Sequence, residues 1–311
     1  MHIGLLFLFK FIPKLKKLFK INNELLGIFY MMLAQLSFAT NDMLVKIIYQ
    51  NYQEIFVLNQ IIFIRGIFAC LVIGLFLFLK NQLDIKIIFS SKKLAIRGIL
   101  ESLCCICFFI GIAKLPFAKV YVLLSLAPIL LTIYGAIFFK EKVRWRRWSA
   151  VFLGFAGVVI VVNPTDLKYG YYFIFPLLAA ILLTFRDIYT KNIKGNFHSL
   201  QIAFITCLIV TIFFGVLSIY KFYNFNFNEY LIMFVSSFFL SLGYIFSIAT
   251  IKVTLVSITS TFRYSVILWG ILFGYFIFNE IPRMNTYLGA LLIIFSGLII
   301  ISRQKKLGRI K

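Results

Sequence analysis

Ten mainly apolar stretches, most of them about 20 residues long, follow one another through this chain of 311 residues. A helix of about 20 residues crosses the hydrocarbon core of a bilayer, and long continuous apolar runs lack the alternation of a membrane β-barrel. The stretches are 25–46, 56–79, 94–113, 118–139, 148–162, 170–190, 199–220, 230–250, 254–278 and 287–302. We therefore predict an all-α membrane protein with ten transmembrane helices.

The composition excludes most soluble classes of protein. Hydrophobic residues make up 62% of the chain, against about 45–50% in soluble domains. The formal net charge of +22 would suggest nucleic acid in a soluble protein. Here it follows the loops instead: 23 of the 32 Lys and Arg residues fall on the side of both termini, five on the other side and four within the stretches. Basic loops stay in the cytoplasm, so we expect a multi-pass protein of the inner (cytoplasmic) membrane, with both termini cytoplasmic and no nucleic-acid partner.

The two halves of the chain show a weak internal repeat. Asn41-Asp42 with Lys46 recurs 145 residues later as Arg186-Asp187 with Lys191. Five spans per half is an odd number, so the second half enters from the opposite side, as in inverted-repeat carriers. We predict repeats at 25–163 and 170–302. Residues 1–24 form either a basic cytoplasmic tail or a helix on the membrane surface, and residues 303–311 form a second basic cytoplasmic tail.

Several motifs along residues 25–302 resemble a known family. They include Leu126-Ala127-Pro128, Glu141 before Trp145-Arg146-Arg147-Trp148, Phe63-Ile64-Arg65, Arg263-Tyr264 and Asn279-Glu280. In these motifs the chain resembles the EamA family of the drug/metabolite transporter superfamily, and within it the S-adenosylmethionine uptake carriers of obligate intracellular bacteria. The resemblance implies a transporter, not an enzyme, that moves a small metabolite and contacts membrane lipids as a monomer or homodimer.

Charged side chains within the spans are the first candidates for a substrate site, because a charge in the bilayer interior costs several kcal/mol unless it is paired or solvated. Arginine suits recognition of a carboxylate, and aromatic rings can stack on a base or hold a cation. Structural ion pairs and ordinary packing remain alternatives for each position. The candidates are Arg65, Arg97, Glu101, Asp187, Arg263, Tyr264 and Trp269.

A second group of residues is a candidate for gating or coupling. Asp42 and Lys46 lie four residues apart, as do Asp187 and Lys191, so each pair either bonds within its helix or closes one face of the carrier. Pro128 removes a helix hydrogen bond and is expected to bend its span. The alternatives are local pairing and a static kink.

The sequence carries no metal or phosphate-loop motif, and we expect no cofactor. The function that we predict is secondary transport of a small polar metabolite by alternating access, with uptake or exchange of S-adenosylmethionine as the specific hypothesis. The alternative is a proton-coupled exporter of amino acids or other metabolites, in which Glu101 carries the proton.

Overall fold

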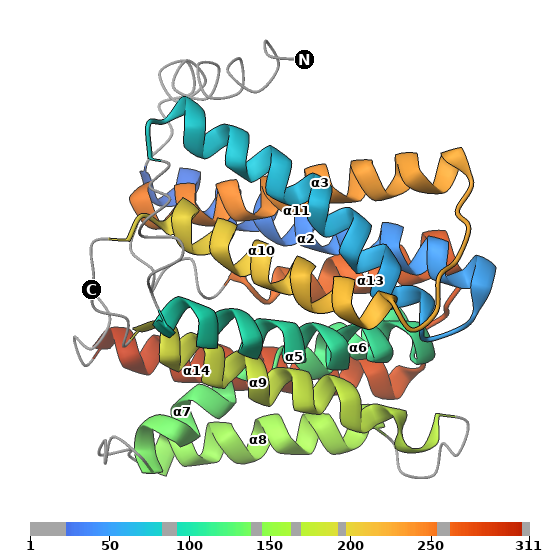
Figure 1. The fold of residues 1–311 in the computed structure, drawn as a ribbon. Coiled ribbons are helices and arrows are strands. Elements are labelled where there is room, and N and C mark those ends of the chain that lie inside the picture. The colour runs from blue at the N-terminus through green and yellow to red at the C-terminus, as the bar shows by residue number, and fades with distance from the viewer. Residues whose placement is uncertain are drawn as a thin grey trace.

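A computed structural model describes residues 23–82, 92–137, 145–162, 169–191, 197–253 and 262–306 of the chain. All regular secondary structure in these ranges is helical, which confirms the all-α prediction (Figure 1). The helices are α2 (Asn23–Tyr52), α3 (Val57–Leu79), α5 (Lys92–Lys114), α6 (Phe117–Leu124), α7 (Ala127–Ile137), α8 (Trp145–Val162), η1 (Gly170–Phe173), α9 (Ile174–Lys191), α10 (Ser199–Ser218), α11 (Phe227–Val253), α13 (Ser265–Phe278) and α14 (Met284–Lys306). Residues 1–22, the greater part of the predicted N-terminal tail, lie outside the described residues.

Six of these helices are long and apolar enough to cross a membrane, and four shorter apolar helices accompany them. Large apolar side chains also cover the outside of the bundle: Leu71, Phe152 and Phe295 are each more than 60% exposed. Such a surface is unfavourable in water and favourable against lipid tails. Together the helices and the apolar surface mark the chain as a multi-pass membrane protein.

The helices lie side by side in two stacked groups (Figure 1). In the group that holds α2, α3, α10, α11 and α13, α2 packs along α11 and α3 packs along α10. In the other group, α5 packs along α9 and α8 packs along α14. The two groups meet where α10 contacts α5 and where α13 contacts α6.

Glycine allows the closest of these approaches. A Cβ atom on Gly157 of α8 would lie 2.8 Å from the carbonyl oxygen of Gly289 on α14. Small residues let membrane helices come together in this way, because van der Waals contact replaces the hydrophobic drive that lipid does not supply. The α8–α14 pair therefore depends on these two glycines.

The fourth predicted span is broken rather than bent. Its helix stops at Leu124 and starts again at Ala127, so Pro128 occupies the first turn of α7. A proline in a first turn removes no internal hydrogen bond, because the first four N–H groups of a helix have no partner within it. The expected kink is thus a two-residue break just before Pro128.

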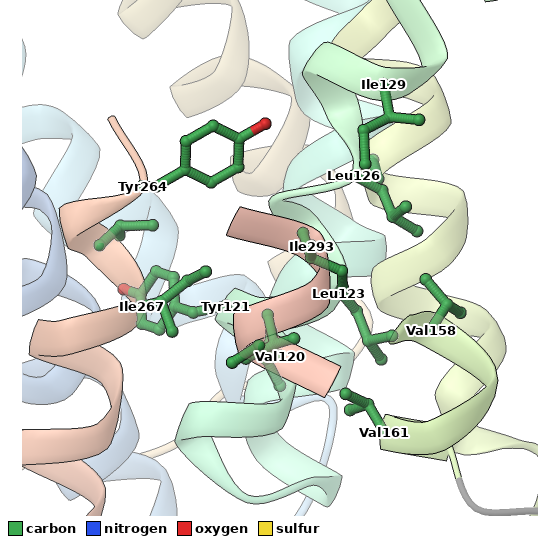
Figure 2. Close-up of a cluster of buried hydrophobic side chains, with 14 of the residues drawn as sticks. Val120, Tyr121, Leu123, Leu126, Ile129, Val158, Val161, Tyr264, Ile267 and Ile293 are labelled. Carbon is green, nitrogen blue, oxygen red and sulfur yellow. The ribbon is translucent and has the colours of Figure 1, made fainter. Parts of the chain in front are cut away.

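The ninth predicted span also differs from expectation. Arg263 and Tyr264 were expected about ten residues inside a continuous helix, but they form a turn that directly precedes α13. Behind this turn lies the largest core cluster, drawn in part in Figure 2, where the Tyr264 ring extends toward the α6–α7 segment that carries Leu126 and Ile129. The ring lies so close to Gly297 of α14 that a Cβ there would overlap it.

Candidate functional site

Three sets of interior charged residues contain the described candidates from α2, α3, α5 and α9. The first, which we call the α5–α9 charge cluster, consists of Arg97, Glu101, Arg186 and Asp187. Arg186 bridges its two acids: Nη1 donates to Glu101 Oε2 at 2.6 Å, and Nη2 donates to Asp187 Oδ1 at 2.6 Å. The side chains of all three residues are less than a third exposed. A buried pair of this kind holds α5 against α9, because either partner alone would leave an uncompensated charge.

Arg97 belongs to the same cluster but binds neutral partners. Its Nε donates to the Thr190 hydroxyl at 3.0 Å, and its Nη1 donates to the Thr206 hydroxyl. Although Arg97 and Glu101 lie four residues apart on α5, the ion pair that Glu101 makes is with Arg186 on α9. Arg97 therefore links α5 to α9 and α10. Its positive charge adds to that of Arg186 in the cluster.

The second set, the Asp42 network, joins α2, α3, α6 and α11. Arg65 Nη1 donates to Asn41 Oδ1 at 2.9 Å, and Asn41 Nδ2 donates to Asp42 Oδ1 at 2.7 Å. The Tyr121 hydroxyl donates to Asp42 Oδ2 at 2.7 Å, and the Ser236 hydroxyl donates to Asn41 Oδ1 at 2.8 Å. All five residues are buried. Arg65 and Asp42 thus interact through an amide and not by direct contact.

The third set joins α2 to the α5–α6 and α13–α14 connections. Lys46 donates to Glu280 Oε1 at 2.6 Å and to the Leu115 carbonyl at 3.1 Å. The other carboxylate oxygen of Glu280 accepts the N–H of Phe117 at 2.6 Å. Phe117 begins α6, where N–H groups lack helical partners and the helix dipole favours an anion. We call Lys46, Glu280 and the start of α6 the terminal closure.

Local sequence explains why Glu280 reaches this point. Asn279 ends α13 in the left-handed conformation, with φ of 51°, which asparagine tolerates better than most residues. The chain then turns back, and the Glu280 N–H donates to the Gly274 carbonyl at 2.8 Å. Pro282 follows and cannot continue the helix. The turn therefore directs the Glu280 side chain across the bundle toward Lys46.

The remaining candidates, Arg263, Tyr264 and Trp269, lie at the turn before α13 and in its first turns. Arg263 is exposed at the turn before α13 and lies within electrostatic range of Asp187. Tyr264 Oη and Trp269 Nε1 are buried and have no hydrogen-bond partner among the described residues. Unsatisfied buried polar atoms are costly and call for an explanation, and a bound ligand would supply one.

Cys105 connects the sets. Its thiol, on α5, lies within electrostatic range of Glu101 and Arg186 and also of Arg65 and Asp42. The α5–α9 charge cluster and the Asp42 network are therefore neighbours in the bundle, and we call the part of the bundle around Cys105 the central region.

The sequence predicted one residue of most of these contacts but not the residue that it contacts. Arg65, Asp42, Lys46, Arg97, Glu101 and Asp187 are all interior residues with polar partners, while Arg186, Tyr121, Glu280, Thr190 and Thr206 were not proposed for the site. Arg186 and Glu280 were visible as charged residues within or beside a span, which is the signal that identifies them. Lys191 ends α9, but its side chain is outside the described set. Among the described residues no cluster of metal-ligating side chains is found.

Comparison with known proteins identifies the family. The model of the EamA-like transporter family matches residues 25–163 and 169–303. The chain belongs to the EamA-like transporter family. It is a transporter and not an enzyme, as the sequence analysis predicted, and its family implies a small-molecule substrate.

Named relatives cover almost the whole chain at low identity. An S-adenosylmethionine uptake transporter of Rickettsia felis is 25% identical over 92% of this chain and 96% of its own length. The pseudopaline exporter CntI of Pseudomonas aeruginosa is 23% identical over 90% of this chain and 97% of its own. A crystal structure with 13% identity matches at a TM-score of 0.62, covering 90% of this chain and 98% of that one, so the fold is shared with a solved protein.

Proposed function

We propose that this transporter takes up S-adenosylmethionine, or exchanges it, by alternating access across the bacterial inner membrane. The observation that carries the proposal is that buried and part-buried side chains of both charge signs lie within electrostatic range of Cys105 in the central region. S-adenosylmethionine carries a carboxylate, cationic groups and a planar adenine ring, which these side chains can bind. The names of the Rickettsia relatives support this substrate class.

Each candidate residue receives a role from its surroundings. Arg65 and Arg263 bind the substrate carboxylate, since each carries a guanidinium group without an acid in direct contact among the described residues. Asp187 and Glu101 face the cationic part. Trp269 and Tyr264 contact the adenine ring. The Trp269 indole N–H and the Tyr264 hydroxyl, which have no hydrogen-bond partner among the described residues, donate hydrogen bonds to it. Arg97 adjusts the charge of the α5–α9 charge cluster.

We propose ten spans in two inverted repeats, at residues 25–163 and 170–302, and the helix contacts support this. An inverted repeat relates the first span to the sixth and the third to the eighth. The α2–α11 contact then has α9–α5 as its counterpart, and the α5–α10 contact has α11–α3 as its counterpart. The α3–α10 and α8–α14 pairs each map onto themselves.

We propose further that the terminal closure is the outer gate and that both termini are cytoplasmic. The loops at 53–56 and 219–226 lie at the end of the bundle that holds Lys46 and Glu280, as the α2–α3 and α10–α11 connections in Figure 1 show. The described loops at this end carry few basic residues, which is typical of the outer face. The closed outer end leaves the substrate route directed toward the cytoplasm, with Lys191 and Pro128 on the helices that move there.

Transport into membrane vesicles tests the substrate. Vesicles with the wild-type chain should accumulate labelled S-adenosylmethionine above empty-vector vesicles, and Arg263→Ala should reduce accumulation at least tenfold. Lys221→Ala, a change of one exposed cation at the outer end, is the matched control and should transport normally. Absence of accumulation at every pH, with the protein correctly inserted, would refute the substrate while leaving the transporter family in place.

The exporter remains the second candidate because one relative is named as an exporter. In that case a pH gradient should drive transport, and Glu101→Gln should abolish the dependence. The ion pair of Glu101 with Arg186 joins α5 to α9, which favours a structural role for Glu101 over that of proton carrier.

A further inference from the structure

Asp42 differs from the other two acids deep in the described spans. Its residue is 7% exposed, and its oxygens accept hydrogen bonds from the Tyr121 hydroxyl and the Asn41 amide, both at 2.7 Å. Glu101 and Asp187 each contact Arg186 directly. Neutral donors satisfy the lone pairs of a carboxylate but leave its charge uncompensated, which is expensive in a low-dielectric interior.

Arg65 is the cation that balances Asp42, and it does so at a distance. Its Nη1 is bound to the oxygen of Asn41, and its Nε has no partner among the described residues. The pair is neutral when Asp42 is ionised. When Asp42 binds a proton, the guanidinium charge is no longer balanced, and a carboxylate arriving at Arg65 restores neutrality.

We propose that Asp42 is a proton-binding site and that its protonation prepares Arg65 for a substrate carboxylate. A proton from water adds to one oxygen of Asp42, and the substrate carboxylate binds at Arg65, so that one proton and one carboxylate enter together. Release of the substrate returns the proton to water on the side where the carrier is open. This inference deepens the proposed transport function by naming its coupling ion, and it rests on that function.

The surroundings of Asp42 hold few groups that compete for the proton. On its own helix Lys46 lies one turn away and is bound by Glu280 after α13. The α11 helix contributes Ser236, which bonds to Asn41 and does not titrate. The remaining titratable or charged neighbours come from the helices α3, α6 and α5: Arg65, Tyr121 and Cys105, with Glu101 further along α5.

Infrared spectroscopy of the full chain in lipid nanodiscs tests the proton site without any substrate. As the pH falls, the wild type should gain a protonated-carboxyl stretching band that Asp42→Asn lacks and Glu101→Gln retains. Tyr121→Phe keeps the carboxyl group and removes its hydrogen bond, so this variant should show the band at a shifted frequency even if Asp42→Asn does not fold. A band that is unchanged in Asp42→Asn, or unshifted in Tyr121→Phe, overturns the proposal.

Proton uptake on substrate binding tests the coupling. In weakly buffered solution with a pH-sensitive dye, S-adenosylmethionine should cause about one proton to be taken up per molecule bound by the wild type and by the control Glu54→Gln, which changes an exposed acid outside the binding site. Asp42→Asn should bind with no proton uptake. Binding by the wild type without proton uptake overturns the coupling. Absence of binding in all variants overturns the substrate instead, and the infrared result then decides the proton site separately.

Discussion

Glu280→Gln is the most informative single substitution at the terminal closure. It keeps the size of the side chain but removes the charge that Lys46 contacts at 2.6 Å. Lys46 has a side-chain exposure of 5%, and that of Glu280 is 22%. The amide can still accept one hydrogen bond, so the substitution isolates the electrostatic part of the contact.

The size of the effect follows from burial. Removing one partner of a buried ion pair typically costs about 3–5 kcal/mol, and the partial exposure of Glu280 places this pair at the lower limit, about 3 kcal/mol. Opening of this end hydrates Lys46 and relieves that cost. The open population should therefore rise roughly 100-fold, at about 1.4 kcal/mol for each factor of ten.

Cys105 serves as the reporter of opening, because its thiol lies within electrostatic range of both the Asp42 network and the α5–α9 charge cluster. Cys70, Cys104, Cys107 and Cys207 are replaced by alanine, and a membrane-impermeant thiol reagent is added outside intact cells. We expect slow labelling in this background and labelling up to about 100-fold faster with Glu280→Gln.

Two control variants separate the gate from general loosening. Lys221→Met breaks the exposed Glu54–Lys221 pair at the same end and should leave the labelling rate unchanged. The exchange Lys46→Glu with Glu280→Lys should restore slow labelling in part, because the charges again attract. If Glu280→Gln labels no faster than the background, or if Lys221→Met accelerates labelling equally, the closure is not a gate.

Three further predictions concern stability, each measured by thermal unfolding in nanodiscs. Arg186→Leu leaves two part-buried acids without their cation and should cost about 3 kcal/mol, the lower limit for a buried pair; a melting temperature equal to the wild type would contradict this. Gly157→Val forces α8 away from α14 and should cost about 1–3 kcal/mol through overpacking, whereas an unchanged melting temperature would show that the helices are not in close contact. Hydrogen bonds from Lys221 and then Tyr223 lower the pKa of Glu54 below its ordinary value of 4.5. The stabilisation by this contact is therefore complete above pH 4.5 and is lost as the pH falls through the lowered pKa. The difference in melting temperature between wild type and Lys221→Met should vanish in acid and persist at neutral pH.

Hydropathy predicted the helices well where a span is uniformly apolar. The second span was expected at 56–79 and is observed at Val57–Leu79, and the seventh was expected at 199–220 and is observed at Ser199–Ser218. The first helix continues to Tyr52, six residues beyond its predicted end. Its last turn is polar, and Glu229 on α11 accepts hydrogen bonds from Asn51 and Tyr52, a partner that no local pattern contains.

The breaks in the helices were harder to predict for the same reason. Pro128 indicated a bend in the fourth span, but not that the helix stops at Leu124 and starts again at Ala127, where α6 and α7 pack against other helices. No residue pattern in the sequence indicated the turn at Arg263 and Tyr264. A helix interrupted within a membrane needs partners for its free backbone groups, and those partners belong to other spans.

The interior charged residues could be identified from the sequence, because an unpaired charge in a membrane span is unfavourable. Which residues pair with one another could be seen only in the folded structure. Spacing of four residues suggested a bond between Asp42 and Lys46 within one helix, yet Lys46 pairs with a residue 234 positions away. Glu101 likewise pairs with a residue 85 positions away. Both pairs connect the first half of the chain to the second. In each of the three sets the positive and negative charges are equal in number, with Arg65 opposite Asp42 in the Asp42 network. Because the bonds of the carrier itself use both charge signs, a substrate that also carries both signs can replace one internal partner by another without leaving an unpaired charge in the membrane. This exchange of partners is the physical reason to expect a zwitterionic metabolite, and not a neutral or purely cationic one, in the central region.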